Sequence, residues 1–180
     1  MEPSELLPAL DELFWLHGRR WRRRGLKGAF ADERIRRFHR DVACRFAGRG
    51  VLRLHRLRLD GKTRALFYCF AGQGRVYYYL SGFDLALARH SLGTVLMAEA
   101  VSRAIAEGAH EFDLLRGDEN YKREWRAEER RTVRLVLSRR SVRSRIALSG
   151  NRLERRLERA GSRLRNRLFG HRRKARSDKS

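Results

Sequence analysis

The chain has little of what a metal site, a disulfide framework or a membrane span requires. Its 180 residues include two cysteines, Cys44 and Cys69, which lie in apolar surroundings and form no CxxC motif. This usage is typical of two reduced, buried thiols in a cytosolic protein. The six histidines have no metal-ligand spacing among themselves or with the cysteines, so the sequence predicts no metal site. No apolar run approaches the ~20 residues of a membrane span, and the acidic N-terminus is unlike a signal peptide. We therefore expect a cytoplasmic protein.

Three catalytic signatures are also absent. No serine or cysteine stands in a nucleophile elbow, and the chain has neither a Walker loop nor a GxGxxG motif. The sequence thus gives no sign of an α/β-hydrolase, a P-loop NTPase or a Rossmann-type dehydrogenase.

Acidic residues are scarce, but the imbalance is uneven. The formal net charge is +22, from 43 Lys and Arg against 21 Asp and Glu. Residues 139–180 carry 16 of these cations and 3 of the carboxylates, a net of +13. The preceding 138 residues are only mildly basic. We therefore predict a domain over residues 1–138 and a basic amphipathic helical tail over 139–180 with a disordered end.

The hydrophobic periodicity predicts two helices, then three strands, then a helix, a strand, a helix and a last strand. Period-2 patterns and tight turns at Asp60-Gly61 and Gly72-Gln73-Gly74 predict an antiparallel meander of three strands. The expected helices are 4–17, 32–47, 92–107 and 119–127, a basic loop is expected at 19–28, and the expected strands are 51–59, 64–71, 75–83, 110–117 and 131–138. This order predicts the α+β class, with helices packed on a mixed sheet.

Three local features refine this expectation. A change of parity at His55-Arg56 indicates a bulge there, or a strand covered on both faces. Gly82 is expected to mark a break in its strand. Apolar residues at helical spacing predict the buried stripe of the helix that starts at Leu92, namely Val95, Leu96, Ala98, Val101 and Ile105.

The start of that helix is the first candidate site. Ser91-Leu92-Gly93-Thr94 follows a strand and a turn, and the first turn of a helix offers unpaired N–H groups to a phosphate. Gly93 would allow close approach of a ligand, and Arg89 could pair with phosphate. The alternative is an ordinary helix start with Ser91 as N-cap.

The second candidate site is the stretch RGDENYKREW, residues 116–125. It leaves a strand and enters a helix on which Tyr121 and Trp125 share a face. The functional interpretation makes Asp118 a general base and Tyr121 a general acid. In the alternative, Asp118 or Asn120 caps the helix and the aromatic residues pack in the core.

The tail leaves three alternatives open. An apolar stripe on an arginine-rich helix can dock on the domain, lie on an anionic membrane at the inner face, or contact RNA or another polyanion.

Two motifs in this order resemble a known family. SGFD…S-x-G-T-x-L, followed by FDxLRGDExYKxxW, is similar to the acetyltransferase domain of the GNAT superfamily, in the branch of FemAB-like and cellulose-biosynthesis-type acetyltransferases. The resemblance covers roughly residues 10–138. It implies a GNAT-like, mostly antiparallel mixed sheet flanked by helices. That branch commonly has two such lobes, so the resemblance implies that this chain supplies one.

The resemblance also implies a cofactor and its site. Acetyl-CoA or another acyl-CoA would be the co-substrate, with its thioester along strand 76–82 beside the splayed strand 111–116. The backbone N–H groups that would cradle its pyrophosphate belong to Leu92, Gly93, Thr94 and Val95. The usual phosphate loop is matched in part, because Arg89 stands one position early and Val95 replaces a small residue.

The implied activity is direct attack of an amine or hydroxyl on the thioester, with no covalent enzyme intermediate. The acceptor would be a small molecule or a cell-envelope precursor. The alternatives are a FemAB-like transferase that uses an aminoacyl-tRNA donor, and a non-catalytic lobe that binds a polyanion or membrane through its tail. The sequence leaves N- versus O-acylation and the oligomeric state open.

Overall fold

The computed structural model describes residues 3–117, 119–133, 135, 137 and 141. Contacts divide the chain into two units, Met1–Glu128 and Glu129–Ser180, and every described helix and strand belongs to the first. The predicted boundary at residues 138–139 and the predicted tail helix lie outside the described residues. None of the described helices is both long enough and apolar enough to span a bilayer.

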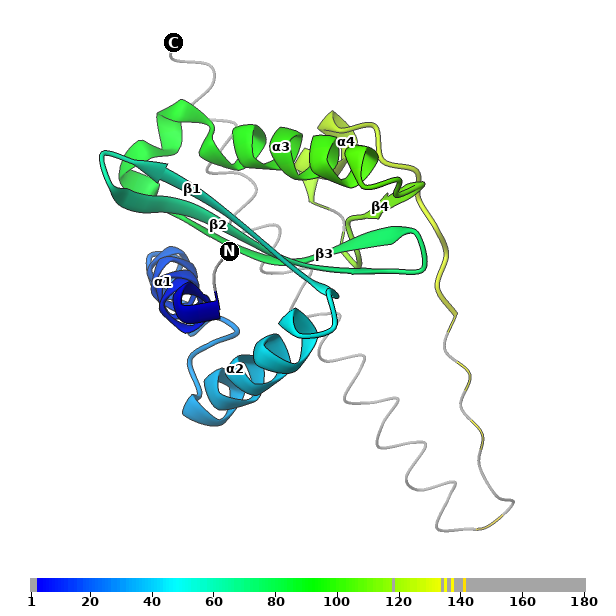
Figure 1. The fold of residues 1–180 in the computed structure, drawn as a ribbon, viewed down its shortest axis with the longest axis horizontal. Coiled ribbons are helices and arrows are strands. Elements are labelled where there is room, and N and C mark those ends of the chain that lie inside the picture. The colour runs from blue at the N-terminus through cyan, green and yellow to red at the C-terminus, as the bar shows by residue number, and fades with distance from the viewer. Residues whose placement is uncertain (1–2, 118, 134, 136, 138–140, 142–180) are drawn as a thin grey trace. The chain divides into compact units, whose positions relative to one another are not determined.

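The first unit follows the predicted order of two helices, three strands, a helix, a strand and a helix, with a 3₁₀-helix inserted after the third strand (Figure 1). Its elements are α1 (Pro3–Arg22), α2 (Glu33–Ala47), β1 (Leu52–Leu59), β2 (Lys62–Gly72), β3 (Arg75–Phe83), the 3₁₀-helix η1 (Leu85–His90), α3 (Leu92–Ala106), β4 (Glu111–Asp113) and α4 (Asn120–Glu124).

The four strands form one mixed sheet in the order β1-β2-β3-β4. The β1-β2 and β2-β3 pairs are antiparallel, and β4 lies parallel to β3. Both hairpins turn on two successive residues with positive φ, Asp60-Gly61 and Gln73-Gly74, which match the twist of the flanking strands. The predicted meander and the predicted α+β class are confirmed.

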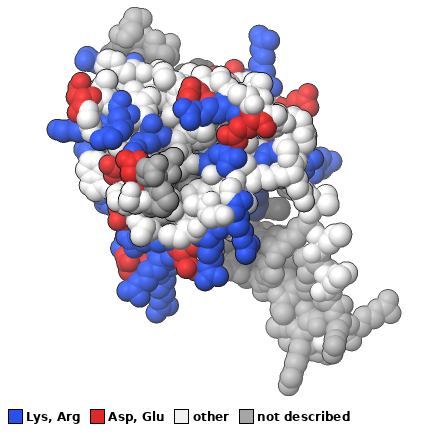
Figure 2. Space-filling model, in the orientation of Figure 1, with Lys and Arg blue, Asp and Glu red and all other residues white. Residues whose placement is uncertain are grey.

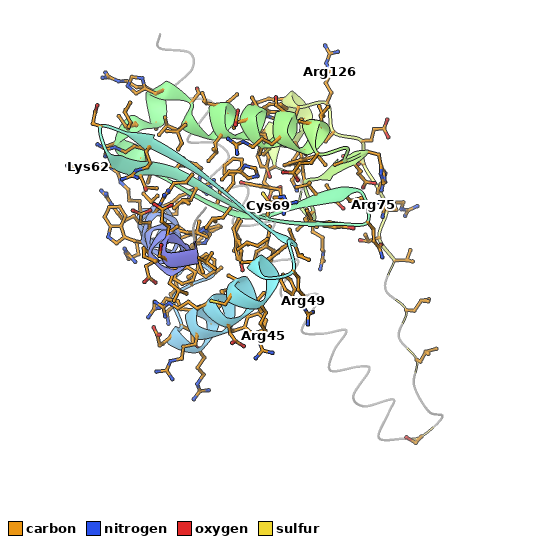
Figure 3. All side chains as sticks on the ribbon, viewed as in Figure 1. Arg45, Arg49, Lys62, Cys69, Arg75 and Arg126 are labelled. Carbon is orange, nitrogen blue, oxygen red and sulfur yellow. The ribbon has the colours of Figure 1, made fainter. Side chains whose placement is uncertain are left out.

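Helices cover both faces of the sheet (Figure 1). The α1/α2 face buries a cluster that includes Leu10, Leu13 and Tyr68. The α3 face buries a second cluster that includes Phe67, Leu96 and Met97, and α4 joins it through Tyr121 and Trp125. Cys69, in the middle of β2, belongs to this second cluster, and Figure 3 shows it at the centre of the sheet. Cys44 of α2 is exposed, so the prediction that both thiols are buried is wrong for this residue.

Several predicted boundaries are wrong. Helix α1 continues to Arg22, so the predicted loop 19–28 begins only after that residue; basic side chains in a last helical turn complement the helix dipole. The register shift of β1 lies at Leu57/Arg58 rather than at His55-Arg56. Nevertheless, Leu52 packs on the α1/α2 cluster and Leu57 on the α3 cluster, so β1 is covered on both faces as the parity change indicated.

The predicted stripe of α3 is rotated. Its buried side chains are Leu92, Leu96, Met97, Ala100 and Ala104, whereas Val95 and Ile105 are exposed. The large aliphatic residues of this helix therefore do not all face the sheet, because small alanines provide the close contact.

The ends of the last predicted strands also differ. Strand β4 has three residues instead of eight, and α4 begins after Glu119, whose side chain makes no cap bond. The described residues of the predicted strand 131–138 belong to no strand, and the side chains of Val133, Leu135 and Leu137 are exposed.

Gly82 does not break β3. It pairs with Leu66 of β2 and lies against α1. A Cβ atom at this position would lie 2.8 Å from the Leu16 Cβ and 2.9 Å from the His17 backbone nitrogen. The glycine therefore permits helix α1 to approach the strand closely.

Candidate functional site

Strand β3 has two halves with different neighbours. Residues Arg75–Tyr77 pair with β2 on one side and with β4 on the other. Beyond Tyr77, the chain of β4 turns away after Asp113, whose carboxylate accepts a hydrogen bond from the Leu115 N–H at 2.7 Å. Residues Tyr78–Phe83, which we call the unpaired half of β3, pair with β2 but with no second strand among the described residues.

A bulge at Tyr79 reorganises the side chains of this unpaired half. The register of the β2-β3 pair places Tyr78 opposite Cys69 and Leu80 opposite Tyr68, so Tyr79 is the additional residue. The bulge reverses the alternation of faces, and Tyr78 and Ser81 consequently lie on the α3 side. Burial raises the pKa of Tyr78 to about 12, although a hydrogen bond with the Ser81 side chain acts in the opposite direction.

Tyr121 of α4 reaches the same place. Its ring lies edge-on to Tyr78, with 6.4 Å between the ring centroids. Burial raises the pKa of Tyr121 above its ordinary value, and Tyr78 and Glu119 add to the shift. Both phenols are therefore protonated at neutral pH and are suited to donate hydrogen bonds, not to accept a proton.

The turn before α4 is held by a buried lysine. The Lys122 Nζ donates to the carbonyl oxygens of Leu115, at 3.0 Å, and Gly117, at 3.3 Å, and pairs with the Glu119 carboxylate at 3.0 Å. Asp118, the predicted base, lies outside the described residues. Glu119 is a described carboxylate that acts electrostatically on both tyrosines.

Phe83 connects the tyrosine pair with the start of α3. Its ring is the nearest neighbour of Gly93, at 4.0 Å from the ideal Cβ position of that glycine. The Arg20 guanidinium from the end of α1 lies 4.4 Å over the same ring. Its charge opposes, but does not cancel, the rise that burial causes in the pKa of Tyr78 and Tyr121. The structure thus brings Gly93 and Tyr121 to one side of the unpaired half of β3.

The start of α3 is open. Ser91 adopts the left-handed conformation, with φ 49°, and its side chain makes no cap hydrogen bond. A non-glycine residue in this conformation is strained, and such strain is concentrated at ligand-binding sites. No backbone acceptor among the described residues receives the N–H of Leu92 or Gly93. The alternative of an ordinary serine-capped helix is therefore not what the structure contains.

The other predicted donors are partly engaged. The N–H groups of Thr94 and Val95 donate to the Ser91 carbonyl oxygen at 2.8 and 3.1 Å. Only two of the four predicted N–H groups thus lack an acceptor inside the helix. Arg89 is exposed at the end of η1, and its Nε donates to the ring of His90 at 3.1 Å.

A histidine closes part of the unpaired half of β3. The Ser81 carbonyl oxygen accepts a hydrogen bond from the His17 Nδ1 at 3.0 Å, and the Ala29 N–H donates to the His17 Nε2 at 3.3 Å. These two partners fix the tautomer with the proton on Nδ1. Burial lowers the pKa of His17, and the Arg20 charge adds to this effect.

Sequence reasoning missed four residues that organise this site, namely Arg20, Tyr78, Asp84 and Lys122. Asp84 of the SGFD motif accepts from the Ala86 N–H at 3.1 Å and pairs with Arg64 at 2.8 Å, which fixes the turn into η1. Its position directly after a strand was a usable signal for a cap. The position of Tyr78 depends on a bulge that the sequence pattern did not reveal.

The described residues contain no group of three or more His, Cys, Asp or Glu side chains arranged to hold a metal ion. The arrangement instead combines an open helix start, two protonated phenols and a partly unpaired strand.

Comparisons with known proteins identify the family of the chain. Residues 4–123 match the family described as "Acetyltransferase (GNAT) domain". The chain therefore belongs to the GNAT acetyltransferase family. The match identifies no branch, so the FemAB-like assignment stays a prediction.

One similar solved structure is an aminoglycoside N-acetyltransferase in complex with CoA. It is 13% identical to this chain, covers 58% of this chain and 87% of its own, and has a TM-score of 0.41. A similarity at this level supports no argument about substrates. No curated protein gives a significant match.

Proposed function

We propose that the domain is an acyl-CoA-dependent N- or O-acyltransferase, with acetyl-CoA as the first candidate donor. The observation that carries the proposal is the open start of α3 beside the unpaired half of β3, in a chain that belongs to the GNAT family. The Ser91 side chain makes no cap hydrogen bond and Gly93 has no side chain. The helix start therefore offers N–H donors, and it has space for an anionic group.

In this proposal the helix start binds the pyrophosphate of the donor. The N–H groups of Leu92 and Gly93 and the positive end of the helix dipole supply the interaction, and Arg89 adds a charge. Thr94 and Val95 contribute through the same first turn, although their N–H groups already donate to Ser91. The thioester then extends along β3 toward Tyr78 and Tyr121.

The reaction is a direct transfer. The acceptor nitrogen or oxygen attacks the thioester carbonyl carbon, the new C–N or C–O bond forms, the C–S bond breaks, and CoA leaves as a thiolate that takes up a proton. Tyr121 and Tyr78, both held protonated, donate hydrogen bonds to the developing negative charge. The acceptor proton is removed by a carboxylate, with Asp118 as the first candidate and Glu119 as the second.

Calorimetry followed by kinetics tests this proposal. We expect acetyl-CoA to bind the full chain, and a panel of amines to release free CoA thiol, detected with a disulfide reagent. Asp118→Asn and Tyr121→Phe should each lower kcat about 100-fold with less effect on the KM for acetyl-CoA. Absence of acetyl-CoA binding would refute the donor, and full turnover in both variants would refute the assigned roles.

The basic charge of the chain favours a second candidate function. In a FemAB-like enzyme with an aminoacyl-tRNA donor, the net charge of +22 over the whole chain would serve the RNA, whereas in a non-catalytic lobe the net of +13 in residues 139–180 would bind a polyanion or an anionic membrane. Binding of tRNA with steep salt dependence should survive deletion of residues 139–180 in the first case. Binding that disappears with the tail supports the second case, and a cytoplasmic protein is expected in both.

A further inference from the structure

A hollow of about 650 Å³ lies between α1, the loop that follows it, and α2. Phe14 and Phe30 line it, with ring centroids 4.5 Å apart. The residues of the proposed acyl-CoA site do not line this hollow. It is therefore a separate feature, which the proposed function does not use.

The Lys and Arg side chains that line the hollow are of two kinds, and those of the first kind are paired with carboxylates. Arg36 pairs with Glu33, and Arg40 pairs with Asp11, both at 2.5 Å, so their charges are compensated. Figure 2 shows Lys and Arg side chains with acidic side chains among them at the lower end of the domain, over α2.

Arg22 and Lys27 differ from these arginines. Neither has a carboxylate partner among the residues that the structure describes. They belong to the segment 13–31, which contains six Lys and Arg and no Asp or Glu. Both side chains are exposed and line the hollow. This wall therefore presents uncompensated positive charge, which attracts anions.

An aromatic side chain stands beside these cations. Trp15 lines the hollow and is 54% exposed, which is unusual for an indole on a helix whose neighbours are buried. The Arg19 guanidinium lies 4.7 Å from the centroid of its ring. An exposed indole next to arginine is a stacking surface for a planar ring, and the flanking cations would bind phosphate.

We propose that this hollow binds a nucleotide, with its phosphate at Arg22 and Lys27 and its base on Trp15. The hollow has the size of a small-molecule site. Phosphate and planar ring are the shared chemistry of a free nucleotide and of one unit of single-stranded RNA. The site operates whether or not the acyl-CoA proposal is correct.

Titration of the full chain with ADP tests the proposal. Arg22→Glu/Lys27→Glu should weaken ADP binding about 30-fold, and Trp15→Ala about tenfold, because both the charge-assisted contacts and the stacking surface are lost. The binding of inorganic phosphate should be weakened by Arg22→Glu/Lys27→Glu but not by Trp15→Ala. The binding of adenosine should be weakened by Trp15→Ala but not by Arg22→Glu/Lys27→Glu.

A matched control removes the contribution of net charge. Arg49→Glu/Lys62→Glu changes the charge of the chain equally at two points outside the hollow, after α2 and at the β1-β2 hairpin (Figure 3), and should leave ADP affinity unchanged. Equal losses in both double variants would overturn the proposal, as would the absence of ADP binding at 1 mM, about the upper end of typical KM values.

Two further arms identify the source and separate the sites. Competition between ADP and a five-nucleotide RNA, lost in Arg22→Glu/Lys27→Glu, assigns the hollow to nucleic acid, and failure to compete assigns it to free nucleotides; the nucleotide site stands in both cases. The start of α3 is proposed to bind the pyrophosphate of acetyl-CoA, which ADP shares, so Gly93→Asp should weaken acetyl-CoA binding but retain the ADP binding that Arg22→Glu/Lys27→Glu removes. If Gly93→Asp removes all ADP binding and Arg22→Glu/Lys27→Glu removes none, the nucleotide site in the hollow is overturned and ADP binds at the start of α3.

Discussion

The two halves of β3 differ although one strand contains both. Residues Arg75–Tyr77 are paired on both edges, and Arg75 forms an ion pair with Glu111 of β4 at 3.0 Å. Residues Tyr78–Phe83 are paired with β2 alone among the described strands, include a bulge, and lie against the end of α1. The first half holds the sheet together, whereas the second half presents backbone and side chains beside α3 and α4.

This difference shows how the fold makes a site from the interior of a sheet. An unpaired strand edge at the surface invites association with other chains, but here helices cover both faces beside it. Part of its polar backbone is satisfied by His17, which binds the Ser81 carbonyl. In the proposed function, the thioester of the donor lies along the rest of this edge.

The largest expected effect comes from Gly82→Ala. The new Cβ would lie 2.8 Å from the Leu16 Cβ and 3.1 Å from the Leu13 carbonyl oxygen, so α1 must move away from the unpaired half of β3. We expect a loss of about 3 kcal/mol in the free energy of unfolding, measured with urea.

Gly72→Ala at the end of β2 is the matched control. No atom lies within 4 Å of the ideal Cβ position there, so the expected change is below about 0.5 kcal/mol. Equal stability of the two variants would show that α1 does not depend on close contact with Gly82.

The second prediction separates stability from binding at the start of α3. Gly93→Asp places a negative charge in the first turn, which stabilises a free helix by about 0.5 kcal/mol. The same charge repels a pyrophosphate, so we expect about 30-fold weaker binding of acetyl-CoA by calorimetry, with no decrease in Tm.

Ser102→Asp introduces the same charge on an exposed position in the middle of α3 and should leave the affinity unchanged. If Gly93→Asp binds acetyl-CoA as tightly as the wild type, the pyrophosphate does not bind at this helix start.

Much of the paired framework could be predicted from the sequence, because its signals are local. Alternation and the two glycine-containing turns defined the meander, and Gly108 ended α3 close to the expected residue. The helix start at Leu92 was also predicted. These features depend on backbone preferences that a short stretch of sequence sets without tertiary contacts.

The unpaired half of β3 could not be predicted in the same way. The bulge at Tyr79 depends on the register with β2, and the role of Gly82 depends on how closely α1 approaches. Val95 and Ile105 of α3 were expected to be buried but are exposed, because packing against the sheet selects small alanines. Such features arise from tertiary contacts and leave no periodic signal.

The third prediction tests the turn that carries α4 to the unpaired half of β3. Lys122→Met keeps the length of the side chain but removes three polar contacts, to Leu115, Gly117 and Glu119. We expect a loss of about 1.5 kcal/mol and faster hydrogen exchange confined to the turn before α4. Arg126→Met, at an exposed position (Figure 3), should change neither quantity; unchanged exchange in Lys122→Met would show that the lysine does not hold the turn.

The smallest effect concerns His17 and the dependence of stability on pH. Burial lowers the pKa of His17 in the folded state, so below about pH 6.5 the unfolded chain binds a proton that the folded chain does not. Stability should be constant above that pH and should fall below it, by at most about 1.4 kcal/mol per pH unit for this one group. Burial also lowers the pKa of His39 and of His55, so the dependence of stability on pH in the wild type is the sum of the three contributions.

His17→Gln should reduce the slope of stability against pH between pH 6.5 and 5, measured from urea unfolding at each pH. An unchanged slope would mean that His17 titrates in the folded chain as it does in the unfolded one, and that burial does not keep its ring neutral beside the unpaired half of β3.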